Sequence, residues 1–249
     1  MTTTVNGLIV ADGERHQLMA LKRFFDENRD TIAIEEDTSF FEDFGIPLPV
    51  KEPEFQYSKL LELWGVEGPG LHCDGYFKDV KFQHGELNWD NRELFLWPED
   101  VDDPCEGVTS DHDVLTWRDE CYCRPCVDIY RLIQEKFPGI RIYAAHDIYS
   151  QYDYSSSDIE GRFFPVKYVY YIYDIGTDEE DEEPSWYIMT DVKGFASLEE
   201  LAEYVKQRHG DIITSDEVID RMNERLEELR RSGMHHTGYC VHRIGFYDI

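Results

Sequence analysis

Apolar residues recur along the chain with two different periodicities, which together predict a protein built from both helices and strands. Residues 13–28 carry Leu18, Leu21 and Phe25 at helical spacing, whereas residues 166–175 are rich in tyrosine and valine, as strands are. Ser197 and Thr214 each precede a glutamate by three positions, which is typical of a helix start. The pattern predicts strands over residues 5–10, 76–83, 87–97, 140–148, 166–175, 186–190 and 239–246, and helices over residues 13–28, 55–64, 125–137, 197–209 and 214–231.

The order of these elements predicts the fold class. Strands and helices do not alternate strictly, which favours an α+β protein over a doubly wound α/β protein. We therefore expect a mixed, largely antiparallel sheet packed by helices, with residues 84–86 as the turn of a hairpin. Residues 1–175 are expected to form one α+β domain. Residues 176–249 are expected to add an acidic loop and a helical extension that packs on the same sheet.

Charge is the most unusual property of the sequence. The chain carries 53 acidic and 24 basic side chains and a formal net charge of −29. Such a field repels nucleic acid and anionic membranes and attracts basic protein surfaces, although a solvated acidic face would explain it equally well. Two acidic runs are the expected contacts for a basic partner: Glu99, Asp100, Asp102 and Asp103 in the first, and Asp178, Glu179, Glu180, Asp181, Glu182 and Glu183 in the second.

The sequence also bears on the compartment and on the state of the cysteines. No apolar stretch follows a basic start, and no apolar run is long enough to cross a bilayer, so we expect a cytoplasmic protein. The six cysteines are then expected to be thiols or metal ligands rather than a disulfide framework.

Residues 121–126 read Cys-Tyr-Cys-Arg-Pro-Cys and are the densest chemical signal. A zinc site is one hypothesis, because a two-residue gap such as that between Cys123 and Cys126 lets both thiolates reach one ion. Cys121 is a third ligand candidate, and the rest of the set would come from Cys73, Cys105 or His112. No second well-spaced pair is present, so zinc is the only cofactor that the sequence suggests, and the ligand set is incomplete.

Thiol–disulfide chemistry is the second hypothesis for these cysteines. A helix N-terminus favours the thiolate, so Cys123 would attack and Cys126 would resolve. Residues 113–209, with Phe164-Pro165 before a strand, resemble a thioredoxin-like α/β unit, although no strongly apolar strand leads into the cysteines. Cysteines that are small buried side chains without chemistry are the third possibility.

Other histidines and motifs add little. His235, His236 and His242 with Cys240 could bind a metal, but a helix C-terminus simply tolerates histidine. The chain has no phosphate-binding glycine loop, no dinucleotide fingerprint, no metalloprotease motif and no nucleophile elbow.

Short motifs in the first two thirds of the chain resemble the YubB-type ferredoxin-like family of plasmid and phage proteins. The resemblance covers residues 6–173 and rests on a first strand, a helix ending Leu-Lys-Arg-Phe-Phe at residues 21–25, and Phe-Gly-Ile-Pro-Leu-Pro at residues 44–49. It continues with Trp64-Gly65, the predicted hairpin, Thr116-Trp117 and Lys-Phe-Pro at residues 136–138. The chain departs from that family by its cysteines before residue 127 and by its helical last third. The resemblance implies a ferredoxin-like fold and an accessory protein of a mobile element with no catalytic residues.

Taken together, these features favour a non-enzymatic phage or plasmid protein that binds a basic, nucleic-acid-handling host protein, in its sharpest form as a DNA mimic that inhibits a host defence system. A thiol–disulfide oxidoreductase using Cys123 and Cys126 and a zinc-stabilised protein-binding module are the alternatives.

Overall fold

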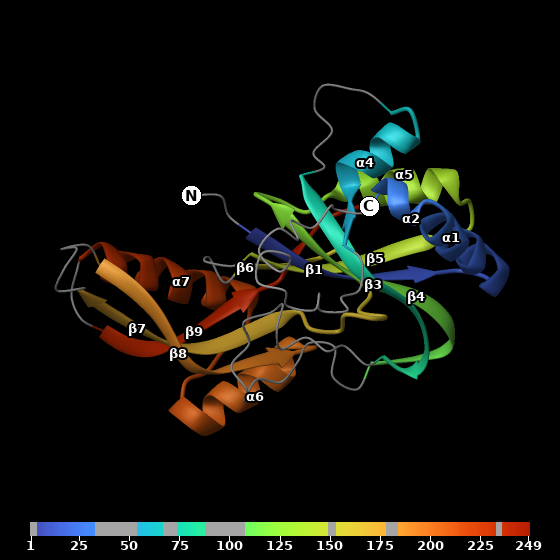
Figure 1. Ribbon diagram of the computed structural model, residues 1–249. Helices are drawn as coiled ribbons and strands as arrows, with labels where there is room; N and C mark the ends of the chain where they lie inside the picture. Colours follow the sequence, from blue (N-terminus) through green and yellow to red (C-terminus); the bar gives the residue numbers. More distant parts are fainter. Residues whose placement is uncertain are drawn as a thin grey trace, which may run out of the picture. The chain divides into compact units, whose positions relative to one another are not determined.

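A computed structural model describes residues 4–32, 54–66, 74–87, 108–148, 153–177, 184–232 and 236–249 (Figure 1). The chain divides into two compact units. Within the described ranges, the first unit takes residues 4–87, 109–148 and 247–249, and the second takes residues 153–246 with Val108. The last three residues therefore return to the first unit after the chain has formed the second.

The first unit is an antiparallel sheet with helices in its crossovers. Its strands lie in the order β5-β1-β4-β3-β2, and β1 pairs with both β4 and β5 in antiparallel register. The strands β3 and β4, and β2 and β3, are antiparallel as well. The elements are β1 (Thr4–Asp12), α1 (Arg15–Glu27), α2 (Arg29–Ile32), β2 (Phe55–Gln56), α4 (Tyr57–Leu63), β3 (Gly75–Glu86), β4 (Thr109–Tyr122), α5 (Val127–Lys136) and β5 (Arg141–Ile148).

Alternation along β1 determines which side chains meet the helices. Val5, Ile9 and Ala11 are fully buried in one core cluster with Leu21 of α1 and Ile129 of α5. Residues two apart on a strand share a face, so one face of the sheet receives both helices. Figure 1 shows α1, α2, α4 and α5 on the same side of this sheet.

The second unit is a three-stranded antiparallel sheet between two helices. The order is β8-β7-β9, and Tyr170 of the central strand packs in a cluster with Leu201 of α6. The next residue, Tyr171, points to the opposite face and packs in a cluster with Leu226 of α7. The elements are β6 (Asp153–Ser156), β7 (Tyr168–Thr177), β8 (Pro184–Phe195), α6 (Leu198–His209), α7 (Asp216–Arg231), β9 (His236–Arg243) and β10 (Gly245–Phe246), which pairs with β6 in parallel.

The predicted fold class is confirmed at the level of an α+β protein with a mixed, largely antiparallel sheet. Ser197 caps α6 as predicted, because its side chain accepts a hydrogen bond from the Glu200 N–H at 3.3 Å. The predicted boundary between residues 175 and 176 falls inside β7, and β8 and β9 pair with β7.

The predicted turn at residues 84–86 was wrong. The strand β3 continues to Glu86, which pairs with Thr109 of β4. Gly85 adopts a left-handed backbone with φ 78° next to a shift in register, so a β-irregularity within a strand produced the glycine signal. The predicted partner strand at residues 87–97 lies outside the described residues, apart from Leu87.

A carboxylate and an imidazole lie at the centre of the first unit's core. The side chains of Asp119 on β4 and His146 on β5 are both fully buried, and Asp119 Oδ1 lies 3.6 Å from His146 Nε2. Asp119 Oδ2 accepts hydrogen bonds from the Tyr57 hydroxyl at 3.0 Å and from the Tyr130 hydroxyl. The His146 ring contacts the Tyr130 hydroxyl through Nε2 at 3.0 Å and the Tyr247 hydroxyl through Nδ1 at 2.6 Å. We call these five residues the buried polar core.

The phenols of the buried polar core stay protonated. Burial is the main cause that raises the pKa of Tyr57, Tyr130 and Tyr247 well above the ordinary value, and the Asp119 charge raises all three further. Each hydroxyl therefore keeps a proton that it can donate to a buried acceptor.

Gly7 makes the space for the buried polar core. Gly7 lies on β1 between two strands. It pairs with Asp119 in the β1–β4 register and with His146 in the β1–β5 register. A Cβ at this position would overlap Asp119 Oδ1 and would lie 2.7 Å from His146 Nε2. Only glycine lets the two side chains meet over the strand.

Gly7→Ala is expected to lower the free energy of unfolding by about 3 kcal/mol or more, because the added methyl group displaces a buried carboxylate from its donors. Urea unfolding of the full chain measures the change. Gly245→Ala is the matched control, since its Cβ would meet only ordinary contacts at 3.7 Å and beyond. Equal effects of the two substitutions would contradict this account of the core.

Candidate functional site

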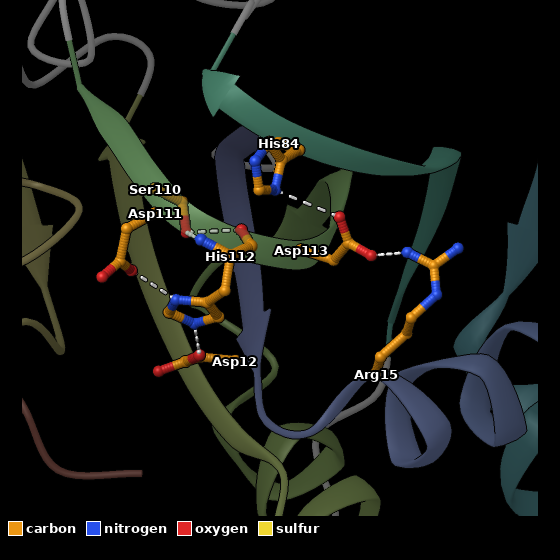
Figure 2. A network of polar contacts seen from close by, with 7 residues as sticks. All are labelled: Asp12, Arg15, His84, Ser110, Asp111, His112 and Asp113. Atoms are coloured by element: carbon orange, nitrogen blue, oxygen red, sulfur yellow. Dashed lines mark hydrogen bonds and ion pairs between the residues drawn. The ribbon is translucent and has the colours of Figure 1, made fainter.

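An open hollow of about 570 Å³ lies where β1 runs into α1, beside the start of β4 (Figure 2). We call it the acidic hollow. Its lining combines four carboxylates with three basic side chains, and the residues come from β1, α1 and its cap, β3 and β4: Asp12, Gly13, Glu14, Arg15, His84, Asp111, His112 and Asp113.

His112 bridges two carboxylates of the acidic hollow. Its Nε2 lies 2.6 Å from Asp12 Oδ1, and its Nδ1 lies 2.6 Å from Asp111 Oδ1 (Figure 2). The hydrogen bond to Asp12 is the largest cause that raises the pKa of His112, the bond to Asp111 adds to it, and burial opposes both. The Ser110 hydroxyl donates to the His112 backbone carbonyl at 2.8 Å, which helps to fix the backbone of this residue.

Asp113 forms the second half of the acidic hollow. It makes an ion pair with Arg15 through Oδ2, and its Oδ1 lies 3.2 Å from His84 Nδ1 (Figure 2). The Asp113 side chain is 20% exposed, whereas that of Arg15 is 69% exposed. A largely buried carboxylate therefore meets an exposed partner, and a competing cation can replace such a partner at little cost.

The acidic hollow suits a cation better than an anion. The side chains of Asp111 and Glu14 are 95% and 78% exposed, so they offer oxygen atoms to a ligand in solution. An ammonium or guanidinium group would form charge-assisted hydrogen bonds with such oxygens. The carboxylates of Asp12 and Asp113 are held by β1 and β4, which reduces the cost of ordering them on binding.

The structure buries two of the three clustered cysteines and exposes the third. Cys121 at the end of β4 and Cys126 before α5 are buried in one core cluster, whereas Cys123 is exposed in the turn between them. His112, a candidate fourth zinc ligand, contacts Asp12 and Asp111. The other candidates, Cys73 and Cys105, lie outside the described residues, and in the described part of the chain no group of three or more His, Cys, Asp or Glu side chains is placed so that it could hold a metal ion. The zinc site stays a prediction.

The two acidic runs predicted to bind a partner, from Glu99 to Asp103 and from Asp178 to Glu183, lie outside the described residues. Their role in binding stays a prediction as well.

In the second unit the structure brings together part of the predicted histidine group. Cys240 Sγ lies 3.2 Å from His242 Nε2, and the Tyr171 hydroxyl lies 2.7 Å from the same nitrogen. His236 contacts the Tyr173 hydroxyl through Nδ1 at 3.0 Å, and His235 lies outside the described residues. Burial raises the pKa of Cys240 to about 12, so this thiol is protonated at neutral pH.

The acidic hollow was missed by reasoning from the sequence. Asp111, His112 and Asp113 form a short alternating polar run, but Asp12 is about a hundred residues away and His84 belongs to another strand. The one usable signal was Asp12-Gly13 between a strand and a helix, because strand ends and helix starts often hold binding residues.

None of the described helices is long and apolar enough to cross a membrane. Comparison of the chain with family models, with curated proteins and with solved structures found no match.

His112 is expected to titrate above its ordinary pKa of about 6.5. Because the folded-state pKa is raised, the stabilisation by the two carboxylates is fully present below the unfolded-state pKa and is lost as the pH rises through the folded-state pKa. Loss of the ring in His112→Gln should cost less than about 1 kcal/mol at low pH, since the contact is partly exposed, and still less at high pH.

NMR titration of the His112 ring and urea unfolding at several pH values test this expectation. Asp12→Asn removes the largest cause of the shift and should lower the His112 midpoint. A cost of His112→Gln that grows with pH would contradict the assignment.

Proposed function

We propose that this chain is a non-enzymatic accessory protein of a phage or plasmid that binds a basic, nucleic-acid-handling host protein through its acidic surface. In its sharpest form, the protein imitates DNA and inhibits a host defence system. The observation that carries the proposal is the formal net charge of −29 on a folded chain. A field of that sign and size attracts basic proteins and accelerates their association.

The acidic hollow gives this attraction a defined point of contact. Four carboxylates line it, against Arg15 and two histidines. A lysine or arginine side chain of the partner would replace Arg15 at Asp113 and reach Asp111, which is 95% exposed. The acidic hollow would then orient the bound partner, and the total charge of the chain would accelerate its association.

Imitation of DNA requires carboxylates held on a rigid scaffold. Duplex DNA presents one negative charge per about 1.7 Å of its axis, and proteins that bind it release counterions when they meet such a row. Asp12 lies on β1, where it pairs with Arg141 of β5, and Asp113 lies on β4, which supports this form of the proposal. The acidic runs from Glu99 to Asp103 and from Asp178 to Glu183 add ten further negative charges to the chain.

The topology of the first unit supports the proposed class of protein. The strands β1, β3, β4 and β5 lie in the order β5-β1-β4-β3, with α1 after β1 and α5 between β4 and β5. We infer a ferredoxin-like arrangement from this order, since that arrangement is built from a β-α-β-β-α-β chain. It agrees with the resemblance to the YubB-type family, which implies an accessory role rather than catalysis.

Binding is expected to weaken steeply with salt, because exposed charges are screened over about 10 Å at 0.1 M. The full chain, immobilised, is exposed to host lysate at about 50 mM and about 300 mM salt, ionic strengths at which screening differs strongly. A captured basic protein should be retained at the lower salt and largely lost at the higher. Asp111→Asn with Asp113→Asn should reduce the affinity of that protein by about tenfold, the loss of one or two charge-assisted contacts.

The matched control is Glu203→Gln with Glu228→Gln, which removes the same charge from exposed positions on α6 and α7. It should change the affinity much less than the pair in the acidic hollow does. Capture that is equal at both salt concentrations would overturn the electrostatic proposal. If the two double variants reduced the affinity equally, the acidic hollow would not be the point of contact.

A further inference from the structure

A second open hollow, of about 570 Å³, lies within the second unit between α7 and β9. Figure 1 shows α7 beside β9. We call this space the α7 hollow. Its described lining comes from α7, β9, β7 and the loop after α6, all of which belong to the second unit. Sites for small molecules typically have this size, on the order of 300–1,000 Å³.

One wall of the α7 hollow is an apolar stripe of the helix. Val218, Met222 and Leu229 line the hollow, and their spacing of four and seven residues places them on one face of α7. Leu226 continues the stripe into the core cluster between the helix and the sheet. A ligand with an apolar part can therefore leave water along this wall.

The opposite wall is aromatic. The side chain of Tyr173 lies over Gly238, its partner on β9, where a Cβ would lie 2.7 Å from the tyrosine hydroxyl. The Tyr173 ring stacks on His236 with the ring centroids 5.8 Å apart. Burial raises the pKa of Tyr173 and of Cys240 to about 12, so neither side chain brings a negative charge into the hollow at neutral pH.

The charged residues around the α7 hollow are sorted by sign. The helix α7 is rich in acidic residues, yet none of them lines the hollow, whereas Arg221 and Arg225 do. These two arginines are four residues apart and therefore neighbours on the helix surface. Among the described residues that line the hollow, the one carboxylate is that of Asp211, which accepts a hydrogen bond from the Tyr239 hydroxyl at 2.7 Å. The hollow is thus locally basic in a chain with a formal net charge of −29.

Both arginines can turn to a ligand. Arg225 forms an ion pair with Glu228 at 2.8 Å, and the two side chains are 70% and 65% exposed. Such an exposed pair is weak, so a ligand carboxylate can replace Glu228 at little cost. Arg221 is exposed as well, and its guanidinium group offers several N–H donors.

We propose that the α7 hollow binds a monocarboxylate with an apolar chain, a ligand of the medium-chain fatty acid type. Arg221 and Arg225 hold the carboxylate, and the apolar chain lies along Met222 and Leu229. The inference goes beyond the binding function proposed above, because it concerns another surface and a ligand of the opposite charge.

Local contacts favour an anion here although the whole protein is acidic. A guanidinium group donates two parallel hydrogen bonds to a carboxylate, and two neighbouring arginines offer more donors than one carboxylate needs. The charges elsewhere on the protein act from farther away and are screened over about 10 Å at 0.1 M salt. The apolar chain of the ligand adds to the affinity because it leaves water.

The test compares octanoate with octylammonium, which have similar apolar chains and opposite charges. The full protein at about 0.1 M salt is titrated with each ligand, and NMR follows the backbone amides of α7 and β9. We expect octanoate to shift these amides with a dissociation constant of about 1 mM or less, and to bind about tenfold more tightly than octylammonium. A surface that merely collects apolar chains would favour octylammonium, because the net charge of the protein attracts cations.

Two sets of variants test the arginines. Arg221→Gln with Arg225→Gln should weaken octanoate binding by about tenfold or more. The matched control is Arg23→Gln with Arg141→Gln, which removes the same charge from exposed positions of the first unit and should weaken it by less than about twofold. Glu228→Gln frees Arg225 from its competing partner and should strengthen octanoate binding by about twofold. This variant keeps both arginines, so it tests the site even if the double variant does not fold.

The proposal would be overturned if octylammonium bound as tightly as octanoate, or if octanoate gave no saturable shifts by about 10 mM. Equal losses of affinity in the two arginine double variants would overturn it as well. None of these results bears on the binding function, whose test is the salt dependence of capture.

Discussion

A carboxylate buried away from water must be held by hydrogen bonds, and Asp119 imposes this requirement on the whole first unit. Its donors, Tyr57 and Tyr130, come from two different helices, and its neighbour His146 comes from β5. Gly7 on the central strand leaves the space in which they meet. Four separate parts of the chain are therefore placed against one another by a single charged group, and apolar packing around them completes the core.

The same group explains where sequence patterns succeed and where they fail. Periodic apolar residues were enough to predict α1, α5 and β7, because their inward faces are apolar. The strand β4 was missed, although it is central in its sheet, because it buries Thr116 and Asp119 among its apolar residues. Periodicity assigns such polar positions to the surface, because the pattern does not show which residues will form hydrogen bonds with them in the core.

Candidate sites were predictable only where the chemistry is local in the sequence. The three cysteines are evident from their spacing, but the spacing does not tell that Cys121 and Cys126 are buried and that Cys123, in a left-handed turn, is exposed. The acidic hollow joins β1, β3 and β4, so no spacing rule could assemble Asp12 with His112. Total charge, by contrast, needs no fold to be known, and it remains the broadest guide to the partner.

The return of Tyr247 to the first unit makes the second unit an insertion in the chain of the first. In the sequence, residues 153–246 lie between β5 and Tyr247, and the Tyr247 hydroxyl contacts His146 of β5. While the first unit is folded, the two ends of this long segment cannot diffuse apart, even if the segment itself unfolds. Closing the ends of this segment lowers the entropy of the unfolded second unit. The folded first unit therefore stabilises the second unit even without any contact between their surfaces.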